Sequence, residues 1–223
     1  PSRLVGSEMC IRDRFITVEG TEGVGKTTNI EFIQNWLNSY NVDFIATREP
    51  GGTPLAEQVR EILLAPRDEK VSDATELLLM FAGRAQHLER VILPALSNGT
   101  WVLCDRFTDA TYAYQGFGRQ MDKDMISQLE QLVQGNLRPN LTLVLDIPVE
   151  IGLERANLRS APDRFEQEEM EFFHRVRNGY LAMAKTYSDR YVVIDASQCL
   201  ESVQADISNA LGDFYRSSKR EQP

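Results

Sequence analysis

The chain has 223 residues, of which 42% are hydrophobic and 26% are charged, and this size supports a single globular domain with a sizeable core. Its formal net charge of −9 disfavours nucleic acid as a partner, because nucleic-acid-binding proteins usually present a basic face. Three widely spaced cysteines suit a reducing compartment, and no apolar run reaches the ~18 residues that cross a membrane, so we expect a cytoplasmic protein without a membrane partner.

The predicted elements begin after a short N-terminal stretch. Residues 1–13 have no clear periodicity and resemble peptides translated from sequencing-adapter DNA, so we predict a non-native extension, then one domain over residues 14–217 and a tail at 218–223. Short apolar runs predict strands at 15–19, 42–46, 101–104, 141–145 and 191–194. Helical spacing predicts helices at 28–39, 53–64, 74–97, near 167–187 and around 203–214. This alternation predicts an α/β fold, with a parallel five-stranded sheet and helices on both faces.

The segment from Gly20 to Thr27 reads GTEGVGKT and fits the phosphate-binding pattern G-x-x-x-x-G-K-[ST] directly after the first predicted strand. Glycines let backbone N–H groups approach phosphate oxygens closely, and the next helix adds the positive end of its dipole. Lys26 would neutralise the β- and γ-phosphates, and the Thr27 hydroxyl would bind Mg²⁺. The alternative is an ordinary glycine-rich turn. We expect a P-loop NTPase fold that holds a nucleoside triphosphate.

Three arginines lie at or near the same predicted edge of the sheet. Arg48 follows the second strand, Arg106 follows the third, and Arg84 lies on the helix between them. Guanidinium groups bind phosphate through paired hydrogen bonds, so this set suggests an acceptor that already carries a phosphate. The alternative is a structural role, in which Arg48 pairs with Glu49 or Arg106 pairs with Asp105.

Five motifs resemble those of thymidylate kinases, in the same order and over residues 14–215. They read EGTEGVGKTT, TREPGGT, LLMFAGRAQHL, CDRFTDATYAYQG and DRFEQE. The resemblance implies a nucleoside monophosphate kinase with a short lid at about residues 154–166. It also implies transfer of the γ-phosphate of ATP to dTMP, with Mg²⁺, to give dTDP for dTTP biosynthesis. A homodimer is implied as well.

The resemblance assigns the phosphate and sugar contacts of dTMP. Arg48 and Arg106 would clamp the dTMP phosphate, and Glu22 would lie near the 3′-hydroxyl. Asp105 would orient Arg106 or a water molecule bound to Mg²⁺. Phosphoryl transfer depends more on charge neutralisation and alignment than on proton abstraction, so an obligatory base is not expected. The residues expected to act in catalysis are Lys26, Arg106, Arg159, Glu22 and Arg48.

The resemblance also assigns the contacts of the thymine base. Arg84 would reach its polar edge, and Tyr114 would exclude a 2′-hydroxyl. Relatives often place a phenylalanine four residues before this arginine, where this chain has Met80. We predict that Phe81, one residue later, stacks on thymine, with a Met80 sulfur contact as the alternative; Phe81 also fits the core stripe of its helix. The full set expected to bind dTMP is Glu22, Arg48, Phe81, Arg84, Arg106, Thr111, Tyr114 and Gln115.

The cation that stabilises the transition state must come from outside the P-loop, because some relatives carry an arginine where this chain has Gly23. Arg155 and Arg159 are four residues apart and share a helical face, and Arg164 follows them. Bacterial members with lid arginines show this pattern. We choose Arg159; the alternative is a solvated charged helix. The set expected to bind ATP is Gly20, Thr21, Glu22, Gly23, Val24, Gly25, Lys26, Thr27, Thr28, Arg155 and Arg159.

Three other functions were weighed. A GTP-hydrolysing switch would need a base-reading N-K-x-D motif, and the chain contains no Asn-Lys dipeptide. A binding module without activity would not need the full set of P-loop and arginine residues. A deoxynucleoside kinase is the nearest rival, but its acceptor has no phosphate and would not require the Arg48 and Arg106 pair.

Overall fold

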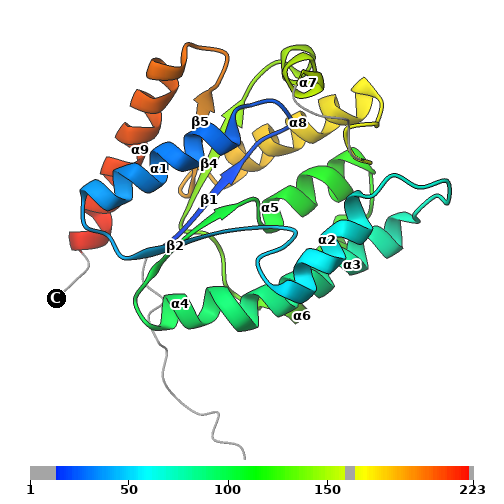
Figure 1. Ribbon diagram of the computed structural model, residues 1–223, viewed down its shortest axis with the longest axis horizontal. Helices are drawn as coiled ribbons and strands as arrows, with labels where there is room; N and C mark the ends of the chain where they lie inside the picture. Colours follow the sequence, from blue (N-terminus) through cyan, green and yellow to red (C-terminus); the bar gives the residue numbers. More distant parts are fainter. Residues whose placement is uncertain (1–13, 159–163, 221–223) are drawn as a thin grey trace, which may run out of the picture.

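A parallel sheet of five strands forms the centre of the protein in the computed structural model, which describes residues 14–158 and 164–220 (Figure 1). The strand order is β2-β3-β1-β4-β5. The strands are β1 (Phe15–Glu19), β2 (Phe44–Arg48), β3 (Trp101–Asp105), β4 (Leu141–Asp146) and β5 (Tyr191–Asp195). This confirms the predicted α/β fold. Strands β2 and β3 lie on one side of the central strand β1, and β4 and β5 lie on the other. A ligand crevice is expected at the carboxyl end of β1, where the strand order changes direction.

One strand differs from its predicted position by two residues. The strand predicted at 42–46 is present, but β2 begins and ends two residues later, from Phe44 to Arg48. Asn41 has a positive φ of 53°, and the Val42 N–H donates to the Leu37 carbonyl at 3.0 Å. These residues therefore belong to the turn after the first helix, and the strand ends on the arginine of the TREPGGT motif.

Helices connect the strands and cover the sheet. They are α1 (Lys26–Ser39), α2 (Pro54–Leu64), α3 (Asp73–His87), α4 (Leu93–Ser97), α5 (Thr108–Thr111), α6 (Lys123–Gln134), α7 (Val149–Asn157), α8 (Met170–Thr186) and α9 (Leu200–Arg220), with π-helical segments η1 (Leu88–Ile92) and η2 (Tyr112–Gly118). Within the described parts of the chain, no helix has both the length and the apolar character needed to cross a bilayer.

The structure can be compared with three predictions about chain organisation, and the outcome differs for each. The helix predicted at 74–97 is present as α3, η1 and α4 in direct succession, and the π-type turn precedes Pro94, which has no N–H to donate. The first residues of the tail predicted at 218–223 belong to the last helix, since α9 continues to Arg220. The predicted extension at 1–13 lies outside the described residues, as does the 159–163 part of the lid.

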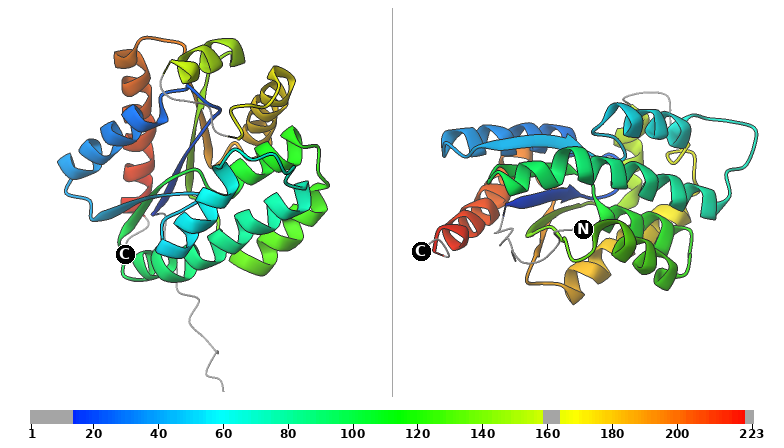
Figure 2. Two further views of the ribbon diagram at one scale, coloured as in Figure 1. Left: turned by 45° about the vertical axis from the view of Figure 1, so that its right-hand side comes forward. Right: turned by 90° about the horizontal axis from the view of Figure 1, so that it is seen from below.

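Different helices cover the two faces of the sheet. On one face α1 and α9 lie side by side, where Ile16 and Val18 of β1 pack with Ile33 and Ile207 (Figure 1, Figure 2). On the other face, η1 and α4 pack on Phe15, while η2 and α8 cover β4. Side chains alternate between the faces of a strand, so a strand covered on both faces is buried throughout. All five residues of β1 are buried.

Two glycines allow η2 and α8 to approach closely. A Cβ atom on Gly179 of α8 would lie 2.6 Å from the Phe117 ring, and one on Gly118 of η2 would lie 2.6 Å from Phe172 and 2.9 Å from Val176. These distances are too short for a side chain. The glycines therefore fix how near η2, which carries the predicted site residues Tyr114 and Gln115, lies to α8.

We expect Gly179→Ala to lower the free energy of unfolding by about 1–2 kcal/mol, because overpacking outweighs the gain of ~1 kcal/mol in helix propensity. The matched control is Gly212→Ala in α9, where the new Cβ would meet only the flexible end of Arg216 at 3.3 Å. This control should gain about 0.5–1 kcal/mol. Urea unfolding followed by circular dichroism measures both. A stabilising effect of Gly179→Ala would contradict the close packing.

Candidate active site

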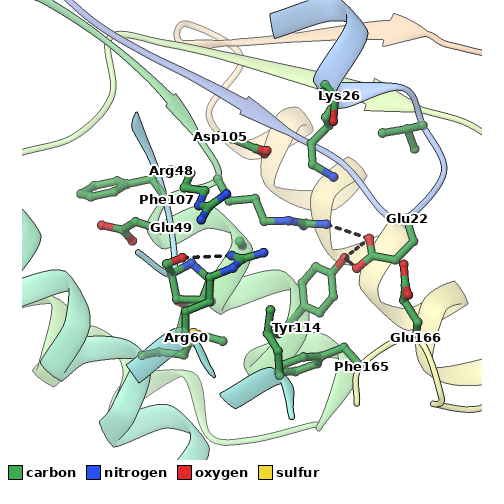
Figure 3. A pocket seen from close by; sticks show the side chains of 18 of the residues that line it. Glu22, Lys26, Arg48, Glu49, Arg60, Asp105, Phe107, Tyr114, Phe165 and Glu166 are labelled. Carbon is green, nitrogen blue, oxygen red and sulfur yellow. Dashed lines mark hydrogen bonds and ion pairs between the residues drawn. The ribbon is translucent and has the colours of Figure 1, made fainter. Parts of the chain in front are cut away.

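A cavity of about 320 Å³ opens at the carboxyl ends of β1, β2 and β3, where the sheet topology places a ligand crevice (Figure 3). Its walls come from the P-loop, α2, α3, the α5–η2 segment and residues 165–166. Lys26 and Glu22 lie on one side of the cavity and Arg48 and Arg60 on the other (Figure 3). The cavity thus joins the predicted phosphate-binding loop to the predicted arginine group.

The P-loop has the backbone geometry that its glycines predict. Gly20, Gly23 and Gly25 have positive φ values of 139°, 72° and 85°. Helix α1 begins at Lys26, whose Nζ donates to the Thr21 carbonyl at 3.3 Å. Helix N-termini attract anions, so loop and helix together form a phosphate cradle. Glu22 to Thr27 line the cavity, whereas Gly20, Thr21 and Thr28 do not.

Arg106 crosses the cavity to the P-loop. Its φ of 65° is the left-handed conformation, and its N–H donates to the Val18 carbonyl at 3.0 Å. The guanidinium lies 4.8 Å from the centre of the Tyr114 ring, and its Nη2 donates to Glu22 Oε2 at 2.7 Å. Arg106 therefore forms its ion pair with Glu22, and not with Asp105 as expected if its role were only structural.

Glu22 is held in place from two directions. Besides Arg106, the Tyr114 hydroxyl donates to both carboxylate oxygens, at 3.0 and 2.9 Å. Burial favours the neutral acid, but Arg106 and Lys26 together with the Tyr114 hydrogen bond outweigh it and lower the pKa of Glu22. Glu22 is thus a fixed, ionised acceptor at the cavity wall.

Arg48 and Arg60 form the opposite side. Arg48 donates from Nη2 to Glu57 at 2.9 Å and remains half exposed, at 53% of its side chain. Arg60 donates to the Pro50 carbonyl at 2.9 Å. Burial and the neighbouring Arg48 lower the pKa of Arg60. The motifs did not predict Arg60; the one signal was a lone basic residue in the helix that follows TREPGGT.

Arg84 is buried and directed into the cavity. Its Nε donates to Glu49 at 2.7 Å and its Nη2 to the Thr111 hydroxyl at 2.9 Å. His87 Nδ1 lies 3.0 Å from the other oxygen of Glu49. Among the described residues, Nη1 of Arg84 has no hydrogen-bond partner, although it is buried. This leaves one unused donor at a cavity-lining residue.

Gln115 presents the complementary group. Its Nε2 donates to Glu76 at 2.8 Å, whereas its buried Oε1 has no partner within the described parts of the chain. Gln115 and Arg84 both line the cavity. A buried polar atom left without a partner costs about 1–3 kcal/mol, so an unused donor and an unused acceptor in one cavity indicate a ligand with the opposite pair.

The prediction that Phe81 faces the ligand is wrong in this structure. Phe81 is 2% exposed and packs with Leu77 and Ile126 in the core, and it does not line the cavity. Met80 lines the cavity instead. Successive helix residues differ by about 100°, so only one of the two side chains can face the ligand.

The described lid residues divide into two groups. Arg164 is held by the body of the protein, since its Nε donates to the Leu63 carbonyl at 2.7 Å and its Nη2 to Glu76 at 2.6 Å. Phe165, beside it, lines the cavity. Arg155 is exposed on α7 and does not line the cavity. Arg159, the predicted transition-state residue, lies outside the described residues.

Glu19 is a buried acid behind Arg106 that the motifs did not single out. It accepts the Phe107 N–H at 2.7 Å and the Tyr180 hydroxyl at 2.8 Å. The Tyr180 oxygen in turn accepts from Arg106 Nη1 at 3.2 Å. Burial, reinforced by the nearby Asp109, raises the pKa of Glu19 to about 8. The clamp arginine therefore rests on a buried, titratable network.

A family model described as thymidylate kinase matches residues 18–207. The chain belongs to the thymidylate kinase family. The reaction of this family is the phosphorylation of dTMP to dTDP with ATP, which explains why one cavity joins a P-loop to an arginine group. The matched residues include the P-loop and all the cavity-lining residues.

Individual relatives resemble the chain over most of its length. It is 59% identical over 201 residues to the thymidylate kinase of Teredinibacter turnerae, covering 90% of this chain and 98% of the relative. It is 59% identical over 197 residues to that of Pseudomonas putida strain GB-1, covering 88% and 94%. A crystal structure of thymidylate kinase from Ehrlichia chaffeensis, 34% identical, matches with a TM-score of 0.73 over 89% of this chain and 98% of that chain.

The raised pKa of Glu19 predicts a pH-dependent stability. Between pH 4.5 and about pH 8, Glu19 keeps a proton in the folded protein that it releases in the unfolded chain. The free energy of unfolding should therefore fall as the pH rises through this range. The slope from one proton is at most ~1.4 kcal/mol per pH unit. Glu19→Gln cannot ionise and should lose this part of the slope.

Urea unfolding at several pH values between about 5.5 and 8 measures this effect. The control is Glu61→Gln, at an exposed position on α2, which should keep the wild-type slope. Equal slopes for wild type and Glu19→Gln would show that Glu19 ionises normally in the folded protein.

Proposed function

We propose that this protein carries out the family reaction in the cavity, with dTMP against the arginines and the phosphates of ATP in the P-loop. The observation that carries this assignment is that Arg84 and Gln115 line the same cavity as the P-loop and Arg106, and that each has a buried polar atom, Nη1 and Oε1, without a partner among the described residues. A phosphate site and a base site in one cavity fit a nucleoside monophosphate.

The base site is complementary to thymine. Thymine presents a carbonyl acceptor at position 4 beside an N–H donor at position 3, which match the donor of Arg84 and the acceptor of Gln115. Cytosine presents the reverse order, an amino donor beside a ring-nitrogen acceptor. Because both protein atoms are buried, the wrong base leaves them unpaired and is rejected strongly. Met80 supplies an apolar, polarisable contact to the ring.

The phosphate of dTMP is bound by arginines from three elements. Arg48 from β2, Arg60 from α2 and Arg106 after β3 all line the cavity. Their mutual repulsion, which contributes to the lowered pKa of Arg60, is relieved when an anion lies between them. Arg48 binds one carboxylate, Glu57, through a single half-exposed ion pair and can exchange it for phosphate.

Glu22 and Tyr114 bind the sugar. The carboxylate is fixed by Arg106 and Tyr114, so it can accept a hydrogen bond from the 3′-hydroxyl without moving. The buried Tyr114 ring, 6% exposed, closes the space where a 2′-hydroxyl would lie. This arrangement favours a deoxyribonucleotide.

Mg²⁺ fits the residues beside the P-loop. Asp105 Oδ1 is buried and has no hydrogen-bond partner among the described residues, and a buried carboxylate oxygen is a ligand for a hard cation or its water. Thr27 lines the cavity nearby. Residues 14–158 and 164–220 contain no group of three or more acidic, histidine or cysteine ligands, which suits Mg²⁺ held mainly by phosphates. When bound, it would neutralise phosphate charge, and Lys26 would do so from the protein side.

We also propose a cytoplasmic homodimer. Helices α3 and α6 pack together and expose large apolar side chains on Leu78, Met125 and Leu132, which are 57%, 47% and 79% exposed. Large apolar side chains exposed on neighbouring helices can mark an interaction site. Sedimentation equilibrium should give twice the mass of the chain, and a monomer at micromolar concentration would contradict the proposal.

One assay tests the function. The protein is incubated with ATP, Mg²⁺ and, in turn, dTMP, dUMP, dCMP, thymidine or no acceptor, and ADP formation is followed. Fast turnover is expected with dTMP and only background with thymidine or no acceptor. Turnover with thymidine alone would indicate a nucleoside kinase. ADP formation at the same rate with and without an acceptor would indicate an NTPase.

The lid arginine has a separate test. Arg159→Ala should lower kcat by about 10³-fold, because an arginine at the transferring phosphoryl group stabilises charge that develops only in the transition state. The dissociation constant of dTMP should stay nearly unchanged. Arg155→Ala, one turn earlier, is the matched control and should change kcat far less. An unchanged kcat in Arg159→Ala would remove the assignment.

A further inference from the structure

Glu76 is a buried carboxylate that the reaction described above does not use. It lies in the first turn of α3 and is 1% exposed. Gln115 Nε2 and Arg119 Nε donate to its Oε1, at 2.8 and 3.3 Å. Arg119 Nη2 and Arg164 Nη2 donate to its Oε2, at 3.3 and 2.6 Å. Glu76 thus accepts hydrogen bonds from η2, from Arg119 directly after it and from Arg164 in the predicted lid.

These contacts determine which end of the Gln115 amide faces the cavity. A carboxylate accepts hydrogen bonds and has no N–H to offer, and both oxygens of this one already face guanidinium donors. The amide group of Gln115 that faces Glu76 must therefore be the NH₂ group. The carbonyl oxygen then points away from Glu76, and this is the buried Oε1 that has no partner among the described residues.

We propose that Glu76 is a specificity-determining positioning residue, which selects thymine over cytosine by fixing the direction of the Gln115 amide. A reversed amide would present a donor to the cavity and would match the ring-nitrogen acceptor of cytosine. The inference rests on the proposed function, since it assumes that Gln115 meets the acceptor base. Glu76 itself touches no substrate and acts through Gln115.

The other partners of Glu76 serve a different purpose. Arg164 also donates from its backbone N–H to the Leu64 carbonyl at 3.1 Å, and its guanidinium lies 4.5 Å from the Phe165 ring. Phe165 lines the cavity and meets the Tyr114 ring edge-on. Loss of Arg164 should loosen this wall for every nucleotide, without turning the Gln115 amide.

The test is the ratio of kcat/KM for dTMP to that for dCMP in Glu76→Gln. The neutral amide can donate as well as accept, so Gln115 is free to reverse. The ratio should fall by about 10-fold or more, the effect of one hydrogen bond of ~1.4 kcal/mol. The KM for ATP should not change. An unchanged ratio in a folded variant overturns the proposal.

Two further variants separate positioning from a general structural role. Arg164→Met should lower kcat/KM for dTMP and dCMP alike and leave their ratio as in wild type. In a Gln115→Ala background, Glu76→Gln should no longer alter the ratio, because the residue through which it acts is absent. If the ratio still falls there, Glu76 acts by another route and the proposal is wrong.

A measurement on the wild-type protein covers the case in which Glu76→Gln does not fold. The side-chain NH₂ resonances of Gln115 are identified by their loss in Gln115→Ala. In the complex with dTMP, these NH₂ protons should show nuclear Overhauser contacts to protein protons and none to the nucleotide. A contact between these NH₂ protons and the bound nucleotide would reverse the proposed orientation. Failure of the proposed function is distinguishable, since the wild-type protein would then not phosphorylate dTMP at all.

Discussion

The ion pair between Arg106 and Glu22 connects the two halves of the active site. Glu22 belongs to the P-loop, which follows β1, and Arg106 follows β3, so the 2.7 Å contact joins the P-loop to the group of cavity-lining arginines. Both side chains are largely buried, and a buried pair of this kind is costly to break. The Tyr114 hydroxyl also donates to Glu22, and the Tyr180 oxygen accepts from Arg106 Nη1, so each member of the pair has a second partner that fixes its orientation.

Acidic residues orient three of the arginines in the site through ion pairs. Arg48 is paired with Glu57, Arg84 with Glu49, and Arg106 with Glu22. A chain with a net charge of −9 repels nucleotides at long range, so binding depends on these placed cations. The acids compensate the arginines before substrate arrives and orient their unused N–H groups.

The local parts of this site could be predicted from the sequence, because each motif carries its own backbone geometry. The P-loop and the strand-end arginines are examples. The partners of those arginines could not be predicted, since Glu57 and Glu22 are brought to them by the tertiary fold. Arg60 was missed for the same reason.

Other errors arose where one residue step decides the result. Phe81 and Met80 differ by about 100° on one helix, and only packing against Ile126 determines which of them is core. No helix was predicted between residues 104 and 141, where α5, η2 and α6 lie, and the position of η2 depends on its close contact with α8 at Gly179. Motifs therefore predicted the chemistry better than the surroundings that direct it.

The backbones of Gly23 and Gly152 touch. A Cβ atom on Gly23 would lie 1.8 Å from the Gly152 carbonyl oxygen, and one on Gly152 would lie 2.6 Å from the Glu22 carbonyl oxygen. The first turn of helix α7 is thus in direct contact with the P-loop. A side chain at position 23 and α7 in this position exclude each other. Because we propose that the transition-state cation comes from the segment beyond α7, moving that cation to position 23 would require α7 to be repacked.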